Sequence, residues 1–205
     1  DFRDSILVSP DFRKALVFLV GFTTDGNVRM ARGFGSYGAG TGLAVGPSGN
    51  VYMSGYFGGG INFDNVALSA TGSDAIFLAS FDANGTARWG RSAGATTITG
   101  GSRRGLAVAV DKDENVYTTG WVAEATDFGD TVLYAQGIAN IFLARYDGSN
   151  GTFRWLRSTG GANYDVGTGV GTDMNGNIFL TGYYQGPISF LGTDSLPNEN
   201  YLSNI

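Results

Sequence analysis

The chain has 205 residues and a formal net charge of −5, and it contains neither cysteine nor histidine. It therefore lacks the usual general base at neutral pH, the commonest transition-metal ligand, and all disulfide and thiolate chemistry. These absences exclude most hydrolase and zinc-enzyme classes, and the acidic balance argues against nucleic acid or an anionic membrane as the main partner. We predict no catalytic residue, no cofactor and no metal ligand, and we leave the binding residues open.

The sequence repeats itself at spacings of 65 and 62 residues, and three landmarks recur in register. The first is Asn, then Val or Ile, then an aromatic residue, beginning at Asn50, Asn115 and Asn177. The second is Phe-Leu with an aromatic residue three positions after the Leu, beginning at Phe18, Phe77 and Phe142. The third is Phe with Leu five or six residues later, beginning at Phe2, Phe63, Phe128 and Phe190. Self-similarity on this scale indicates a repeat architecture.

Each full unit is predicted to contain four strands separated by turns. In the first unit these strands cover residues 42–45, 51–57, 75–81 and 86–92. The segments Gly46 to Asn50 and Asp82 to Gly85 supply the glycine, asparagine and aspartate typical of hairpin turns. No stretch keeps a helical period over three turns, so the pattern predicts an all-β chain.

The first strand of each unit has very small residues at alternate positions. Since side chains alternate across a strand, this spacing predicts one face reduced almost to the backbone, opposite a normally packed face. Such a face indicates close approach of a neighbouring backbone, as at the centre of a β-propeller. A β-solenoid is the alternative, although its coils are usually shorter. The small residues are Gly40, Gly42, Ala44, Gly105, Ala107, Ala109, Gly167, Gly169 and Gly171.

We therefore predict an all-β, partial β-propeller of about three blade equivalents, each with four antiparallel strands. Residues 1–36 are predicted to form an outer half-blade, 37–95 and 102–161 one blade each, and 164–205 a half-blade. Propellers typically close with four to eight blades. We expect this chain to be a segment of a larger propeller, or a fragment of which several copies complete one ring.

The second unit also resembles a known repeat family. It carries Asn115 to Gly120, then Asp127-Phe128, Ile141 to Asp147 and Arg154-Trp155, and the first unit repeats most of this series. This series is similar to the bacterial β-propeller repeats called SBBP. The resemblance implies a secreted or cell-surface bacterial protein in which propellers act as scaffolds or binding modules, and it implies no catalytic residues.

Several groups of residues invite a functional interpretation, and each has a structural alternative. Asp111, Asp113 and Asn115 have the spacing of a calcium loop, but hairpin turns use Asp and Asn for their own backbone hydrogen bonds. The glycine strings 38–42 and 167–171 lack the strand and helix that a nucleotide loop requires, which favours packing.

Paired arginines also recur, at Arg29 and Arg32, Arg88 and Arg91, and Arg154 and Arg157. They are typical of charges that guard a sheet edge, or alternatively of a ring that contacts acidic partners.

Aromatic residues recur on the second strand of each unit, at Tyr56, Trp121, Tyr183 and Tyr184. Packing between blades is the favoured explanation, and a sugar-stacking surface is the alternative. Specificity is more often carried by unrepeated loops on a rigid scaffold. The clear insertion is Thr96 to Arg104, and 63–74 and 128–140 are the other variable connections.

The leading hypothesis is a non-enzymatic scaffold or binding module for a protein or glycan partner, with no direct membrane insertion and possible membership of a larger complex. A carbohydrate-active domain with two carboxylates is the second hypothesis, because glycoside chemistry needs no histidine. A structural spacer or assembly component is the third. The candidate carboxylates are Asp64, Asp74, Glu124, Asp127, Asp130 and Asp165.

Overall fold

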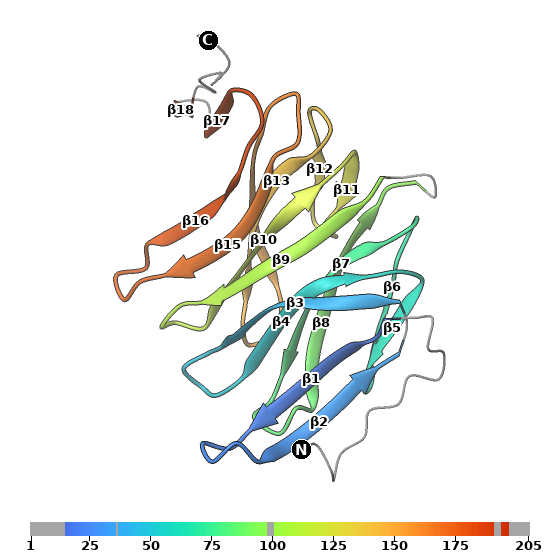
Figure 1. Ribbon diagram of the computed structural model, residues 1–205, viewed down its shortest axis with the longest axis vertical. Coiled ribbons are helices and arrows are strands. Elements are labelled where there is room, and N and C mark those ends of the chain that lie inside the picture. Colours follow the sequence, from blue (N-terminus) through green and yellow to red (C-terminus); the bar gives the residue numbers. More distant parts are fainter. Residues whose placement is uncertain (1–14, 36, 98–100, 191–193, 197–205) are drawn as a thin grey trace, which may run out of the picture.

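The computed structural model describes residues 15–35, 37–97, 101–190 and 194–196, and the strands in these ranges stack as antiparallel layers (Figure 1). The described residues form no helix, and therefore none that could cross a membrane. The all-β, propeller-like fold is thus confirmed. The third landmark at Phe2 lies outside the described part of the chain, as do all of residues 1–14.

Two complete blades form the middle of the stack. Blade 1 has the strand order β3-β4-β7-β8 and blade 2 the order β9-β10-β13-β14, from the innermost strand outward. Blade 1 consists of β3 (Gly38–Val45), β4 (Val51–Phe57), β7 (Ala75–Phe81) and β8 (Ala87–Ala95). Blade 2 consists of β9 (Arg103–Val110), β10 (Asn115–Val122), β13 (Asn140–Asp147) and β14 (Phe153–Thr159).

A two-stranded half-blade lies at each end of the stack. The first consists of β1 (Val17–Phe22) and β2 (Val28–Phe34), and the last of β15 (Val166–Thr172) and β16 (Ile178–Tyr183). In Figure 1 the layers follow one another from the blue β1 and β2 to the orange β15 and β16.

Each unit also contains a hairpin that the sequence pattern did not predict. The segments treated as variable connections form β5 (Gly60–Phe63) with β6 (Val66–Ser69), and β11 (Ala125–Asp127) with β12 (Val132–Tyr134). A third hairpin has β17 (Ile188–Phe190) and β18 (Asp194–Leu196). A full unit therefore has six strands, four in the blade and two in the hairpin.

Each hairpin reaches back to the outer strand of the preceding layer. β11 pairs with β8 of blade 1, and Ser189 of β17 forms a bridge with Gly160 just after β14. At the first hairpin, the Phe63 ring lies 4.9 Å from the Phe34 ring of β2. The third landmark, Phe followed by Leu, is therefore the signature of this interlayer hairpin.

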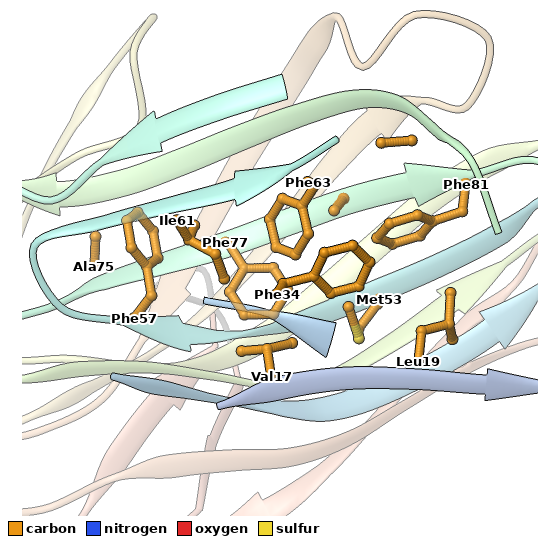
Figure 2. Close-up of a cluster of buried hydrophobic side chains, with 12 residues drawn as sticks. Val17, Leu19, Phe34, Met53, Phe57, Ile61, Phe63, Ala75, Phe77 and Phe81 are labelled. Atoms are coloured by element: carbon orange, nitrogen blue, oxygen red, sulfur yellow. The ribbon is translucent and has the colours of Figure 1, made fainter. Parts of the chain in front are cut away.

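The core is divided between the interlayer spaces. One buried cluster lies between the first half-blade and blade 1, where Phe63 packs among Phe34, Phe77 and Phe81 (Figure 2). A second cluster lies between blades 1 and 2, and includes Trp89, Phe128 and Phe142. All seven residues of β7 are buried because this strand contributes to both clusters.

In the innermost strands the small residues do not all lie on one face, although the sequence predicted it. Each contains a β-bulge, so that Gly40 pairs with Gly55 while Gly42 pairs with Ser54, the next residue of β4. Cross-strand partners share a face and Gly55 and Ser54 lie on opposite faces, so Gly40 and Gly42 do too. The expected single small face was wrong because one residue in each strand, Thr41 in β3, is unpaired.

The inferred close approach of backbones is nevertheless confirmed. A Cβ atom on Gly42 would lie 2.8 Å from the Cα atom of Ala107 in blade 2, and one on Gly105 would lie 3.0 Å from the carbonyl oxygen of Gly55. Real Cβ contacts are longer than this, so glycine at these positions sets the spacing between layers.

The outer strand of each layer holds a turn of the next layer. From β8, the Trp89 indole donates to the Gly148 carbonyl oxygen at 3.0 Å, and Nε of Arg91 donates to the Gly151 carbonyl oxygen at 2.8 Å. Arg88 donates to the Ser149 carbonyl oxygen of the same turn. We call Arg88, Trp89 and Arg91 the turn clamp of blade 1.

The same clamp recurs one layer earlier, where Arg29 of β2 donates to the Ala83 carbonyl oxygen in the β7–β8 turn. Neither interpretation of the paired arginines named this role. β11 pairs with the outer strand β8 only at Gly94 and Ala95, so the edge-guarding interpretation of Arg88 and Arg91 stays a prediction. They bind backbone carbonyls of the neighbouring blade.

A second interlayer contact depends on Glu114, which stands where the other units have Gly49 and Gly176. Its backbone adopts a positive φ of 63°, an unfavourable conformation for a residue with a side chain. Its carboxylate accepts hydrogen bonds from the Ser48 amide at 3.1 Å and the Tyr52 hydroxyl at 3.0 Å, both in blade 1. The strain is offset by a bond between layers.

We expect Gly151→Ala to destabilise the fold more than Gly176→Ala. Both glycines have positive φ, 71° and 86°, so each substitution carries a backbone cost of about 1–2 kcal/mol. At Gly151 the new methyl would also meet the Trp89 ring at 2.6 Å, whereas nothing lies within 4 Å of Gly176. Urea denaturation measures the free energy of unfolding of both variants, and equal losses of this free energy would contradict the turn clamp.

We expect Glu114→Gln to destabilise the protein by about 1 kcal/mol at neutral pH, because hydrogen bonds to a charged acceptor are stronger. Burial alone would raise the pKa of Glu114, but the bonds from Ser48, Tyr52 and Asn50 lower it below the ordinary value of 4.5. The extra stability is therefore complete above that value and is lost as the pH falls through the lowered pKa.

The measurement is the difference in unfolding free energy between wild type and Glu114→Gln across the acid range. Asp111 and Asp173, whose pKa values are also lowered, titrate alike in both proteins and cancel in this difference. A difference that is independent of pH would contradict the assigned role.

Candidate binding site

Six side chains form a row across three layers at one end of the stack. We call this end the loop end. Here the first strand of each layer begins and its second strand ends, whereas the tight turns lie at the opposite end. The row combines Tyr and Trp rings with one guanidinium group. Its members are Tyr37, Tyr56, Arg104, Trp121, Tyr164 and Tyr183, and we call them the aromatic row.

Arg104 joins blade 1 to blade 2 within this row. Its guanidinium carbon lies 3.9 Å from the centre of the Tyr56 ring and 6.0 Å from that of Trp121. Both distances are within the range of cation–π attraction, which favours Arg over the face of Tyr or Trp.

Ring contacts extend the row on both sides. Tyr37 lies edge-on to Tyr56 at 6.3 Å, and Trp121 lies 5.3 Å from Tyr164 in the last layer. Tyr164 stacks on Tyr183 at 6.5 Å with an interplanar angle of 17°. The two terminal rings are about half exposed, Tyr37 at 48% and Tyr183 at 49%, so the row reaches the surface.

The repeat explains most of this arrangement. Tyr56, Trp121 and Tyr183 occupy equivalent positions at the end of the second strand, as the sequence predicted. Packing between blades is confirmed for Tyr56 and Trp121. Tyr184, the fourth predicted aromatic, instead lines a cavity with Leu180 and Ile188.

The sequence does not predict Arg104 as a site residue, although Arg104 belongs to the unrepeated insertion Thr96 to Arg104. Tyr37 of blade 1 and Tyr164 of the last half-blade occupy equivalent positions, where blade 2 has Ser102. In blade 2, Arg104 is the residue that contacts the Tyr56 and Trp121 rings. Residues 98–100 of the insertion lie outside the described part of the chain.

The buried carboxylate of Asp74 holds Arg103 and Arg104, the last two residues of the insertion, in place. Asp74 is 3% exposed and forms ion pairs with Arg104 and with the fully buried Arg103, whose Nη1 lies 3.7 Å from Oδ1 of Asp74. Arg103 also donates to the Thr126 hydroxyl and to the Asp74 carbonyl oxygen at 2.8 Å. Burial lowers the pKa of Arg103, and Asp74 acts against this shift. The carboxylate thus anchors the guanidinium that joins the two blades.

The Asp111 segment, which has the spacing of a calcium loop, forms a hydrogen-bonded turn. One oxygen of Asp111 accepts from the amides of Asp113 and Asn115, and the other accepts from the side chains of Asn115 and Tyr117. Asp173 makes the equivalent bonds with Asn175 and Asn177. Among the described residues, no three acidic side chains gather as metal ligands.

The candidate carboxylates also have separate local partners. Asp64 accepts from the Ala87 amide, Glu124 from the Gly101 amide, and Asp127 from the Gly129 amide. Asp165 is buried and accepts from the amides of Gly161 and Gln185, while Asp130 is exposed. Each bound carboxylate orders a turn or a loop.

The glycine strings do not form a phosphate-binding loop. Residues 38–42 lie within β3 and residues 167–171 within β15, and no helix follows either strand in the described residues. The packing interpretation is confirmed at Gly42 and Gly167, whose added Cβ atoms would meet atoms of the adjoining blade.

We expect Asp74→Asn to destabilise the fold by about 3–5 kcal/mol, because it leaves the buried Arg103 charge uncompensated. Asp113→Asn is the matched control: Asp113 pairs with Lys112, but the two side chains are 66% and 48% exposed. The control should change stability by less than about 1 kcal/mol. Urea denaturation measures both, and similar effects would contradict the anchoring role.

The comparisons with known proteins complete this description. No family model matches the chain. The chain is similar, at 26% identity over 156 residues, to the uncharacterized WD repeat-containing protein L264 of Acanthamoeba polyphaga mimivirus. The similarity covers 61% of this chain and 11% of that protein, so the chain spans about a ninth of its relative's length. WD repeats are propeller blades of four strands, in agreement with the fold observed here.

Proposed function

We propose that this chain is a non-enzymatic propeller scaffold that binds a protein partner through the aromatic row at its loop end. The single observation that supports this proposal is the composition of the row: tyrosine, tryptophan and arginine are the residues most enriched at the energetic centres of protein interfaces. The likeness to a WD-repeat protein supports a propeller scaffold in general terms.

The row suits an extended peptide segment of the partner. It runs across three rigid layers, and its rings are already ordered by contacts with one another. Binding therefore requires little additional side-chain ordering, which is a major cost of association. The flat rings favour apolar and aromatic side chains, and the Arg104 charge, shared with Asp74, favours polar backbone or acidic groups.

The resemblance to SBBP repeats is the basis for a further part of the proposal, a secreted or cell-surface bacterial location. A glycan is the alternative partner, because sugars also stack on Tyr and Trp rings. The stacked pair Tyr164 and Tyr183 is the observation that favours this alternative.

We expect peptides selected from a random display library against the wild-type chain to depend on the row. Trp121→Ala and Arg104→Ala should each weaken binding by tenfold or more, the effect of about 1.4 kcal/mol. Tyr134→Ala is the control, because Tyr134 is 71% exposed on β12 and does not belong to the row. Calorimetry measures affinity, and thermal unfolding checks that each variant is folded.

Selected peptides that bind the Trp121→Ala and Arg104→Ala variants as tightly as wild type would refute the proposed site. A glycan array distinguishes the alternative partner: glycan binding that Trp121→Ala abolishes, without any peptide binding, would favour the sugar.

A further inference from the structure

A methionine of β2 stands where the turn clamp of blade 1 has its tryptophan. The spacing of Arg29, Met30 and Arg32 repeats that of Arg88, Trp89 and Arg91. The strand register agrees, since Met30 and Trp89 each follow a residue that a β-bulge leaves unpaired. Met30 therefore has, in the first half-blade, the position from which Trp89 holds the β13–β14 turn of blade 2.

Met30 packs against the β7–β8 turn of blade 1. An added Cβ atom on Gly85 would meet first the sulfur of Met30 and then its terminal methyl group, at 3.1 Å. Gly85 is buried and has a positive φ of 79°, so the thioether lies directly on the backbone of the turn. Trp89 also donates a hydrogen bond to a turn carbonyl oxygen, whereas a thioether has no proton to donate. Met30 thus holds its turn by apolar packing alone.

Met30 also borders the first buried cluster. Its side chain is half-buried and packs against this cluster, which lies between the first half-blade and blade 1. On the β1 side, an added Cβ atom on Gly21 would lie 3.2 Å from Cγ of Met30. The side chain fills the space between two strands and a turn. A polar atom introduced at this place would lose contact with water, which costs free energy unless a hydrogen bond replaces it.

The three methionines of the chain differ in their exposure. Met174 is 76% exposed in the β15–β16 turn, Met53 is 3% exposed in the core, and Met30 is half-buried between layers. The chain has no cysteine, so no thiol of its own competes for an oxidant. Met30 is therefore the methionine that combines access to solvent with a contact between layers.

We propose that Met30 is a site of reversible oxidation by peroxide, and that its oxidation loosens the first half-blade from blade 1. Hydrogen peroxide transfers one oxygen atom to Sδ of Met30: the sulfur loses two electrons, the O–O bond breaks and water leaves. The sulfoxide is polar, so it no longer packs well against the Gly85 turn and the apolar cluster. Methionine sulfoxide reductases reverse the change, releasing the oxygen as water with two electrons from thiols.

Peroxide treatment followed by mass spectrometry and thermal unfolding tests this site. Wild type should gain the sulfoxide at Met30, and its melting temperature should fall by about 2–4 °C or more. Met30→Leu keeps an apolar side chain of similar volume without sulfur, so its melting temperature should fall much less. Met174→Leu is the matched control and should lose as much as wild type, because Met174 is exposed.

Two results would overturn the proposal. One is an equal fall in melting temperature for Met30→Leu and wild type, and the other is a Met30 that stays reduced while Met174 is fully oxidised. Oxidation of Met53 does not confuse the comparison, because it acts alike in wild type and in Met30→Leu.

Hydrogen exchange locates the loosened contact without any substitution. After oxidation, the amides of β1, β2 and the β7–β8 turn should exchange faster, whereas those of the β13–β14 turn, held by Trp89, should not change. The two reductases, one for each sulfoxide epimer, should restore both the exchange and the melting temperature. Faster exchange throughout both blades, or a loss that persists once Met30 is reduced again, would contradict the assigned site.

Discussion

The close approach of backbones at the innermost strands is the constraint on which the rest of the structure depends. Glycines in β3, β9 and β15 allow neighbouring layers to come within contact distance of each other's main chain. Any side chain at Gly42 would meet the backbone of blade 2, so the two layers would have to move apart at this point. The interlayer aromatic clusters, the turn clamp and the Glu114 bond all require this spacing, because hydrogen bonds and ring contacts weaken steeply over a few tenths of an ångström.

The sequence predicted the blades well because their signals are local. Strands β4 and β7 begin and end where the pattern of Val51 and Ala75 placed them, and turn glycines such as Gly49 adopt the positive φ that hairpins require. It failed where the structure depends on partners in another layer. The hairpin strands are three or four residues long, which is too short for a periodicity signal. The packing role of Phe63 depends on its contact with the Phe34 ring in another layer, which the sequence of the hairpin does not indicate.

The aromatic row illustrates the same division. The repeat predicted where Tyr56 and Trp121 would lie relative to the blades, but the pairing of Arg104 with Asp74 joins residues thirty positions apart in different blades. Nothing in either segment alone indicates that pair. The sequence likewise does not predict the bulge at Thr41. One unpaired residue moves every later side chain of the strand to the opposite face without changing the composition of the strand. The extra hairpin also accounts for the length of this repeat, which exceeds the 40–45 residues typical of WD blades.

The hairpins have a consequence for how the chain folds as it is synthesised. β8 ends at Ala95, but β11 and β12, which continue its sheet, end at Tyr134. At typical elongation rates of about 5–20 residues per second, this interval lasts about 2–8 seconds. During that time the end of the outer strand of blade 1, Gly94 and Ala95, lacks the partner strand that the next unit supplies. The sheet of each blade is therefore finished only when the next unit has emerged, so blades are completed in order from the amino terminus.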